Sequence, residues 1–312
     1  MTNTNIITTD NRQATWAKIG TDVSVATTID EVLEMTKLDY TVSPQKMYLA
    51  NGIEIPDKVC NVDSNGNIKG VVGSNYVACQ NKDAFAFVNN ISDKLTFVKA
   101  GETYRGMIYV IAKLDDVNCL GDNITPYIIL QNGHNGRYTL KTTICPLRIV
   151  CQNQFAMSFR NNPNTITIHH RDSLPDRMHE AEYLMKNVSN YMKEFVLSAE
   201  ELATLKINHK KANEIITKFF EKALKVNATE RQEKAIAEKI ENMQNIYSKT
   251  IKDDLANFKN TGWGLVNAFS DFVTHQEPAR IAEHTLERKF DKVTFDDTVI
   301  VEFINFMKAA VA

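Results

Sequence analysis

Two spacings of apolar residues divide the chain into two parts. In the first part, short apolar and β-branched runs alternate with turn residues, which predicts about eight strands and about three helices. In the second part, apolar residues recur every three or four positions, which is typical of helices. We therefore predict an α+β fold. Its expected parts are a flexible arm at 1–14, an antiparallel-rich sheet domain at 15–174 and a mostly helical region at 175–312 packed on it.

The clearest fold signal surrounds Asn135-Gly136, two residues that suit a tight hairpin turn. Strands are predicted on either side, at Tyr127–Leu130 and Tyr138–Ile144. Pro146 then begins a segment, ending at Phe155, that we predict to be helical. Asn164–His170 alternates in polarity as a strand does. A hairpin, a helix and a strand are thus expected to form the core of the sheet domain.

Local signals predict where other elements begin. The capping box at Thr28–Glu31 predicts a helix from Ile29, and a similar box at Ser198–Glu201 predicts a second helix start. Asn65-Gly66 predicts another hairpin turn. Asn81 is expected to cap a short helix with its side chain.

Two apolar runs also indicate how their elements pack. Arg105–Leu114 is almost continuously apolar, which predicts a central strand. Between Ile236 and Phe258, apolar residues follow a near-heptad stripe. This stripe has two interpretations: a helix packed on the sheet domain, or a seam between subunits.

Composition describes an ordinary globular protein, with 312 residues, 43% apolar and 24% charged. The net charge of −2 does not by itself indicate a nucleic-acid partner, so such a role must depend on a local patch. One basic segment exists, from Arg137 to Arg177, in which basic residues outnumber acidic ones. Its basic members are Arg137, Lys141, Arg148, Arg160, Arg171 and Arg177.

Catalytic and metal-binding patterns are weak. The five cysteines form no CxxC pair, which predicts reduced thiols in a cytoplasm. Cys151 could approach His169 or His170, but an apolar setting favours an inert thiol. The acids at 115, 116 and 122 are expected to be solvated turn residues. We predict no enzyme activity, cofactor or metal, and the absence of a long apolar run predicts no membrane span.

Several segments carry a family resemblance: Trp16–Thr21, Gly70–Tyr76, Gly133–Gly136, Arg148–Asn153 and Thr261–Ala268. In these segments the chain resembles the phage/plasmid-like family, the domain-of-unknown-function family numbered 932. The resemblance implies a mobile-element context and, through it, nucleic-acid transactions.

The chain departs from the family pattern beside His134, where Asn135 replaces an acid that the family tends to have. This departure weakens a metal or catalytic role for that histidine.

The leading hypothesis is a cytoplasmic phage or mobile-element protein that binds or anneals single-stranded DNA in recombination or replication, and that assembles into a ring or other homo-oligomer. Tyr138 and Phe155 would stack on bases. The predicted phosphate contacts are Arg137, Lys141, Arg148, Arg160, Arg171, Lys210 and Lys211. The alternative is a protein–protein interaction module, such as an inhibitor of a host defence system.

Overall fold

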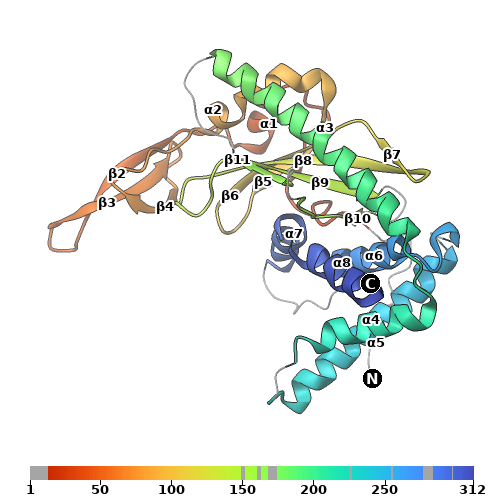
Figure 1. The fold of residues 1–312 in the computed structure, drawn as a ribbon. Helices are drawn as coiled ribbons and strands as arrows, with labels where there is room; N and C mark the ends of the chain where they lie inside the picture. Colours follow the sequence, from red (N-terminus) through yellow and green to blue (C-terminus); the bar gives the residue numbers. More distant parts are fainter. Residues whose placement is uncertain are drawn as a thin grey trace.

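The computed structural model describes residues 13–148, 152–159, 163–167, 174–224, 227–253, 256–276, 284–296 and 298–312. Two antiparallel sheets come first along the chain, and helices make up most of the remainder (Figure 1). The predicted α+β fold is thereby confirmed. Residues 1–12 of the predicted arm lie outside the described residues, whereas Ala14 at its end is buried.

The larger sheet has the order β1-β5-β6-β8-β9-β10, with β11 beside β9 and β7 beside β8. All of its pairings are antiparallel. Its strands are β1 Thr21–Asp22, β5 Thr96–Glu102, β6 Met107–Lys113, β7 Val117–Cys119, β8 Asp122–Gly133, β9 Lys141–Arg148, β10 Asn153–Gln154 and β11 Thr165–Thr167.

A smaller sheet, with the order β2-β3-β4, extends away from the larger one (Figure 1). It comprises β2 Val42–Tyr48, β3 Glu54–Asp63 and β4 Ile68–Gly73. The hairpin predicted at Asn65-Gly66 joins β3 to β4, and Gly66 has a φ of +86°. The Asp63 carboxylate accepts the backbone N–H groups of Asn65 and Asn67, which fixes this turn.

The helices follow the predicted division of the chain. They are α1 Ile29–Thr36, α2 Asn81–Phe85, the 3₁₀ helix Ala86–Lys94, α3 Leu174–Thr204, α4 His209–Glu221, α5 Glu230–Asp253, the 3₁₀ helix Ala256–Phe258, α6 Gly262–Asp271, the π-helix Phe272–Gln276, α7 Thr285–Phe295 and α8 Thr298–Val311. Among the described residues, no helix combines the length and the apolar content that crossing a bilayer requires.

The larger sheet is buried on both faces, which explains the continuous apolar run of β6. Ile108 and Val110 pack into a core shared with α1, α2 and α3. Tyr109 and Ile111 point the other way, into a second core with Trp16 and with Phe290 of α7. Alternate side chains of a strand face opposite sides, so a strand covered on both sides must be apolar throughout. The central strand predicted at 105–114 is therefore confirmed over Met107–Lys113, whereas Arg105 and Gly106 lie in the turn before it.

The helix predicted from Pro146 to Phe155 is wrong. Pro146 and Leu147 belong to β9, opposite Pro126 and Thr125 of β8, and β10 follows at Asn153. A short apolar run buried on both faces has the same composition in a strand as in a core helix. Among the described residues, the core segment is therefore a hairpin and the further strands β10 and β11.

Two predicted caps are also wrong. Asn81 does not cap α2; its amide donates to the Leu38 carbonyl, 2.8 Å away, and Gln80 precedes the helix without a side-chain bond to it. Ser198 lies inside α3, which runs without interruption to Thr204. The capping box at Thr28 is confirmed, because its hydroxyl accepts the Glu31 N–H.

The apolar stripe of α5 packs against other helices of the same chain. Met243 and Tyr247 are fully buried, and α5 packs against α4 and α6. These two residues support packing within one chain rather than a seam between subunits. The elements that α5 contacts are helices, however, and not the sheet. The helices join the sheet through Trp263 of α6, whose ring stacks on Phe155 at 5.7 Å.

Candidate nucleic-acid interface

The turn between β5 and β6 presents a tyrosine and an arginine at one end of the larger sheet. The Thr103 N–H donates to the Met107 carbonyl at 2.8 Å, and Gly106 has a φ of +78°, which closes the turn. Thr103 is buried, whereas the next residue, Tyr104, is 38% exposed. The turn therefore holds Tyr104 and Arg105 at the surface on an ordered backbone.

Tyr104 is the centre of a cluster of aromatic and basic side chains. The His284 ring stacks on it with centroids 4.0 Å apart and planes 5° from parallel. Its hydroxyl accepts hydrogen bonds from Nε of Arg105 at 2.7 Å and from Nε of Arg288 at 3.1 Å. Glu287 accepts the Tyr104 N–H at 3.2 Å, which fixes α7 to the turn.

Asn135 connects this turn to the loop between β8 and β9. Its amide nitrogen donates to the Arg105 carbonyl at 2.7 Å, and its amide oxygen accepts the Arg137 N–H at 3.0 Å. Gly136 has a φ of +74°. The predicted hairpin is confirmed, but its loop spans residues 134–140, between the end of β8 and the start of β9, and is longer than a two-residue turn.

Tyr138 and Lys141 flank the same cluster. Tyr138 is half-buried against the second core, and burial, together with Asp291, raises the pKa of its hydroxyl, while Arg105 and Arg137 oppose that shift. The Lys141 ammonium lies 5.4 Å from the centre of the Phe295 ring. We call Tyr104, Arg105, Arg137, Tyr138, Lys141, His284 and Arg288 together the aromatic–arginine patch.

The patch has a moderate excess of positive charge. Four of its members are arginine or lysine, against the neighbouring acids Glu287 and Asp291. Burial raises the pKa of the Asp291 carboxyl, while the charge of Arg105 opposes that rise. Exposed aromatic rings can stack on bases, and guanidinium groups pair with phosphates, so the patch has the chemistry to hold a single strand.

Arg148 must be removed from the predicted phosphate contacts. Its side chain is only 2% exposed, and its Nη2 and Nε lie 2.8 and 2.9 Å from Oδ2 of Asp122. The guanidinium is thus bound to Asp122 inside the fold, where a phosphate cannot reach it. Phe155 is likewise fully buried, against Phe195 and Trp263, and cannot stack on a base.

The remaining predicted residues do not join the patch. Lys210 and Lys211 lie on α4, which packs against α5 and α8 at a distance from the β8–β9 loop (Figure 1). Lys211 Nζ is 3.7 Å from Glu214. Arg160 and Arg171 lie outside the described residues. The structure therefore brings together Arg137, Tyr138 and Lys141 of the predicted set.

A partly buried polar joint, formed by Tyr40, Asp63, Lys69 and Glu102, holds the smaller sheet against the larger one. Lys69 of β4 lies 2.9 Å from Glu102 and 3.4 Å from Asp63. Burial opposes the charge of the ammonium, but hydrogen bonds with Glu102 and Tyr40 raise the pKa of Lys69. Burial and the charge of Glu102 raise the pKa of Tyr40 to about 12.

His134 lies in the same joint and is neutral. Asn81 Oδ1 accepts from Asn132 and lies 3.1 Å from His134 Nε2; since a carbonyl oxygen only accepts, Nε2 carries the proton. Burial lowers the pKa of His134 to about 4. The Asn61 amide donates to the His134 carbonyl at 2.7 Å, which ties β3 to the loop.

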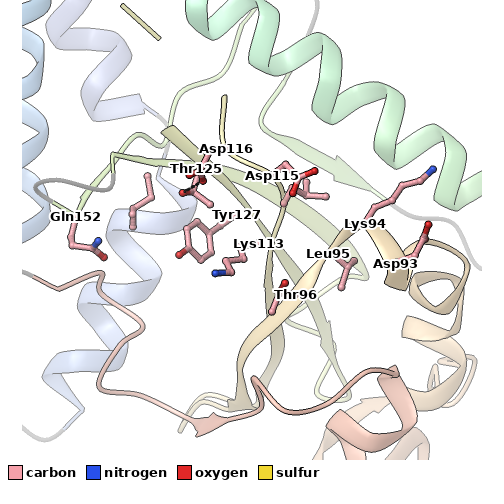
Figure 2. Close-up of a pocket in the computed structure, with 12 residues that line it drawn as sticks. Asp93, Lys94, Leu95, Thr96, Lys113, Asp115, Asp116, Thr125, Tyr127 and Gln152 are labelled. Atoms are coloured by element: carbon pink, nitrogen blue, oxygen red, sulfur yellow. Dashed lines mark hydrogen bonds between the residues drawn. The ribbon is translucent and has the colours of Figure 1, made fainter. Parts of the chain in front are cut away.

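A polar hollow of about 510 Å³ lies at the opposite end of the sheet (Figure 2). Lys113 ends β6 and Tyr127 lies on β8, while Asp115 and Asp116 follow β6. Thr125 donates to Asp116 at 2.7 Å. Because lysines and aspartates share this hollow, it has no single sign of charge with which to attract phosphate.

Two of the described cysteines, Cys119 and Cys145, are buried thiols. Burial raises the pKa of Cys119 and of Cys145 to about 12, so both are protonated thiols at neutral pH. Cys151, His169 and His170 lie outside the described residues. Within the described ranges, no group of three or more His, Cys, Asp or Glu side chains is placed to hold a metal ion.

The chain belongs to the family described as a domain of unknown function, DUF932, whose model matches residues 69–293. The predicted resemblance is thereby confirmed at the level of the family. The match includes all seven residues of the aromatic–arginine patch. No curated protein and no solved structure matches the chain.

Four residues of the patch were missed from the sequence: Tyr104, Arg105, His284 and Arg288. Arg105 was assigned to a strand, although Gly106 signals a turn beside it. Tyr104 and Arg288 are separated by 184 residues along the chain, so only the packing of α7 on the sheet brings them together.

Proposed function

We propose that this protein binds single-stranded nucleic acid, with single-stranded DNA as the preferred ligand, through the aromatic–arginine patch. The observation that supports the proposal best is Tyr104, a residue that is 38% exposed. His284 covers one face of its ring, and its hydroxyl accepts hydrogen bonds from two guanidinium groups. The context that we propose is recombination or replication of a phage or another mobile element.

The patch suits a strand without sequence preference. Every base has a π-face that can stack on Tyr104 or Tyr138, and such stacking is largely independent of sequence. Arg105 and Arg288 are held by their Nε atoms, which orients each guanidinium beside the ring. Phosphates on either side of a stacked base would meet these groups and Arg137.

The test is the salt dependence of binding to a labelled oligothymidylate, followed by fluorescence anisotropy from about 50 to 200 mM salt. Three or four phosphate contacts give an expected slope of log affinity against log salt of about −2 to −3 for a single strand. Undetectable binding, or affinity that does not change with salt, would contradict the proposal.

Two double variants that each remove two positive charges test where on the protein the strand binds. Arg105→Ala with Arg137→Ala should reduce the slope by about 1.4, because two phosphate contacts are lost. Lys210→Ala with Lys211→Ala removes the same charge from α4 and should leave the slope unchanged. The reverse outcome would place the strand on α4 and reject the patch. Competition with an RNA of the same sequence distinguishes the two nucleic acids.

The second candidate function is a protein–protein interaction module, such as an inhibitor of a host defence system. It is favoured by exposed apolar side chains on and after β4, since Ile68 is 73% exposed and Val77 is 87% exposed. Stoichiometric co-purification with one host protein, lost in Val77→Asp and accompanied by no strand binding, would support this function over the first.

A further inference from the structure

The hairpin of β2 and β3 ends in an apolar tip. Tyr48, Leu49 and Ile53 are 57%, 52% and 59% exposed there. The Leu49 N–H donates to the Ile53 carbonyl at 2.8 Å, and the Gly52 N–H donates to the Leu49 carbonyl at 2.9 Å. The tip is therefore an ordered turn that presents three large apolar side chains to solvent, although burial would favour each of them.

An apolar groove of about 780 Å³ lies between α3 and the β7 end of the larger sheet. Cavities of roughly 300–1,000 Å³ accommodate ligands in proteins, so this one has room for a few side chains. Leu197, at its edge, is 61% exposed. The apolar side chains that form it include Val117, Met185, Val188, Met192 and Val196.

The tip and the groove lie at opposite ends of the molecule (Figure 1). The smaller sheet is held at its base by polar contacts, among them the buried bond from Asn61 to the His134 carbonyl and the ion pair of Lys69 with Glu102. Because this base is fixed, the tip of a chain does not reach the groove of the same chain. Each feature therefore needs a second molecule.

We propose that the tip of one copy docks into the groove of a second copy, so that the chain assembles head to tail. A second copy is the favoured occupant because the chain itself carries an apolar projection that matches its own apolar groove. The charges are also compatible. The groove is edged by Lys94 and Lys193 together with Asp115 and Glu200, and the tip carries the ion pair of Lys46 with Glu54.

Both surfaces thus balance positive and negative groups, and identical copies do not repel each other there. A contact between two different surfaces of the same chain repeats from copy to copy, so it closes into a ring or continues as a filament. This proposal gives the predicted self-association a specific contact, and it does not depend on nucleic-acid binding.

Sedimentation velocity at about 1 to 100 µM tests the proposal, since a small apolar contact is expected to be of micromolar strength. The wild-type chain should form species larger than a monomer as concentration rises. Leu49→Glu with Ile53→Glu in the tip, or Leu197→Glu in the groove, should each give a monomer. Val25→Glu, at an apolar residue that is 79% exposed elsewhere, should assemble as the wild type does.

Mixing the two monomeric variants is the decisive step. The tip variant keeps an intact groove and the groove variant keeps an intact tip, so the mixture should form a dimer and nothing larger. A monomeric wild type, variants that assemble normally, or a mixture that stays monomeric would each overturn the proposal. Thermal unfolding checks the fold; if Leu197→Glu is unfolded, Asn118→Arg on the β7 side of the groove replaces it.

Discussion

Arg148 at the end of β9 and Asp122 at the start of β8 form an ion pair inside the fold, with Nη2 and Nε of the arginine 2.8 and 2.9 Å from one carboxylate oxygen. The arginine side chain is 2% exposed and the aspartate side chain is 23% exposed. The pair closes the end of the sheet where β8 and β9 meet. It also makes the guanidinium of Arg148 unavailable to a ligand.

Removal of the carboxylate should destabilise the protein strongly. In Asp122→Ala the buried guanidinium loses its ion pair with Asp122, and we expect the free energy of unfolding to fall by about 2–3 kcal/mol, below the full cost for a fully buried pair because the aspartate is partly exposed. Urea denaturation measures the change. Glu54→Ala breaks the exposed pair with Lys46 and should cost less than about 1 kcal/mol. Equal costs for the two variants would contradict this account.

Stability should fall as the pH is lowered through the range that His134 controls. Burial lowers its folded pKa to about 4, while the unfolded chain has the ordinary value of 6.5. Below pH 6.5 the unfolded state therefore binds a proton that the folded state does not, so unfolding is favoured until the folded form also titrates. The stabilisation is complete above pH 6.5, and about 3 kcal/mol is lost by pH 4.

The measurement is urea denaturation between pH 7 and pH 4. His134→Gln removes the titrating group, and the fall in stability across this range should become smaller than in the wild type. His209→Gln, at an exposed position on α4, should retain the wild-type slope. If both variants keep the wild-type slope, another group is responsible for the acid sensitivity.

Gly70 allows β4 to approach the loop of the patch. A Cβ atom at this position would lie 2.6 Å from Asn135 Cβ and 2.7 Å from Asn135 Cα. Since the backbone of Asn135 would have to move, we expect Gly70→Ala to cost about 1–3 kcal/mol. Gly73→Ala, in the same strand, has nothing within 4 Å of the added atom and should be close to neutral. Thermal melting of the two variants compares them directly.

Tyr104 should contribute to strand affinity through its ring. Loss of one stacked base costs about 1–3 kcal/mol, so we expect Tyr104→Ala to weaken oligothymidylate binding by about 5- to 150-fold. Tyr183→Ala removes a tyrosine that is 57% exposed on α3, outside the patch, and should bind as the wild type does. Equal affinity for all three proteins would remove Tyr104 from the proposed site.

Part of the candidate site was predictable from local sequence. Arg137, Tyr138 and Lys141 were identified because they lie close together beside a recognisable turn, and the structure keeps them close together. Arg288 and His284 have no local signal of this kind. They join the site only because Phe290 of α7 packs against Tyr109 on the second face of the sheet, with ring centroids 5.1 Å apart.

The sequence by itself determined the features that depend on neighbouring residues. The Thr28 cap, the Asn65-Gly66 turn and the apolar central strand at 107–113 follow from backbone preference and from a continuous apolar run, which act over a few residues. Tertiary structure decided whether Pro146–Arg148 became helix or strand, because burial on both faces removes the periodicity that separates the two. It also decided that Arg148 pairs with Asp122, since the cost of an unpaired buried charge is set by the folded surroundings.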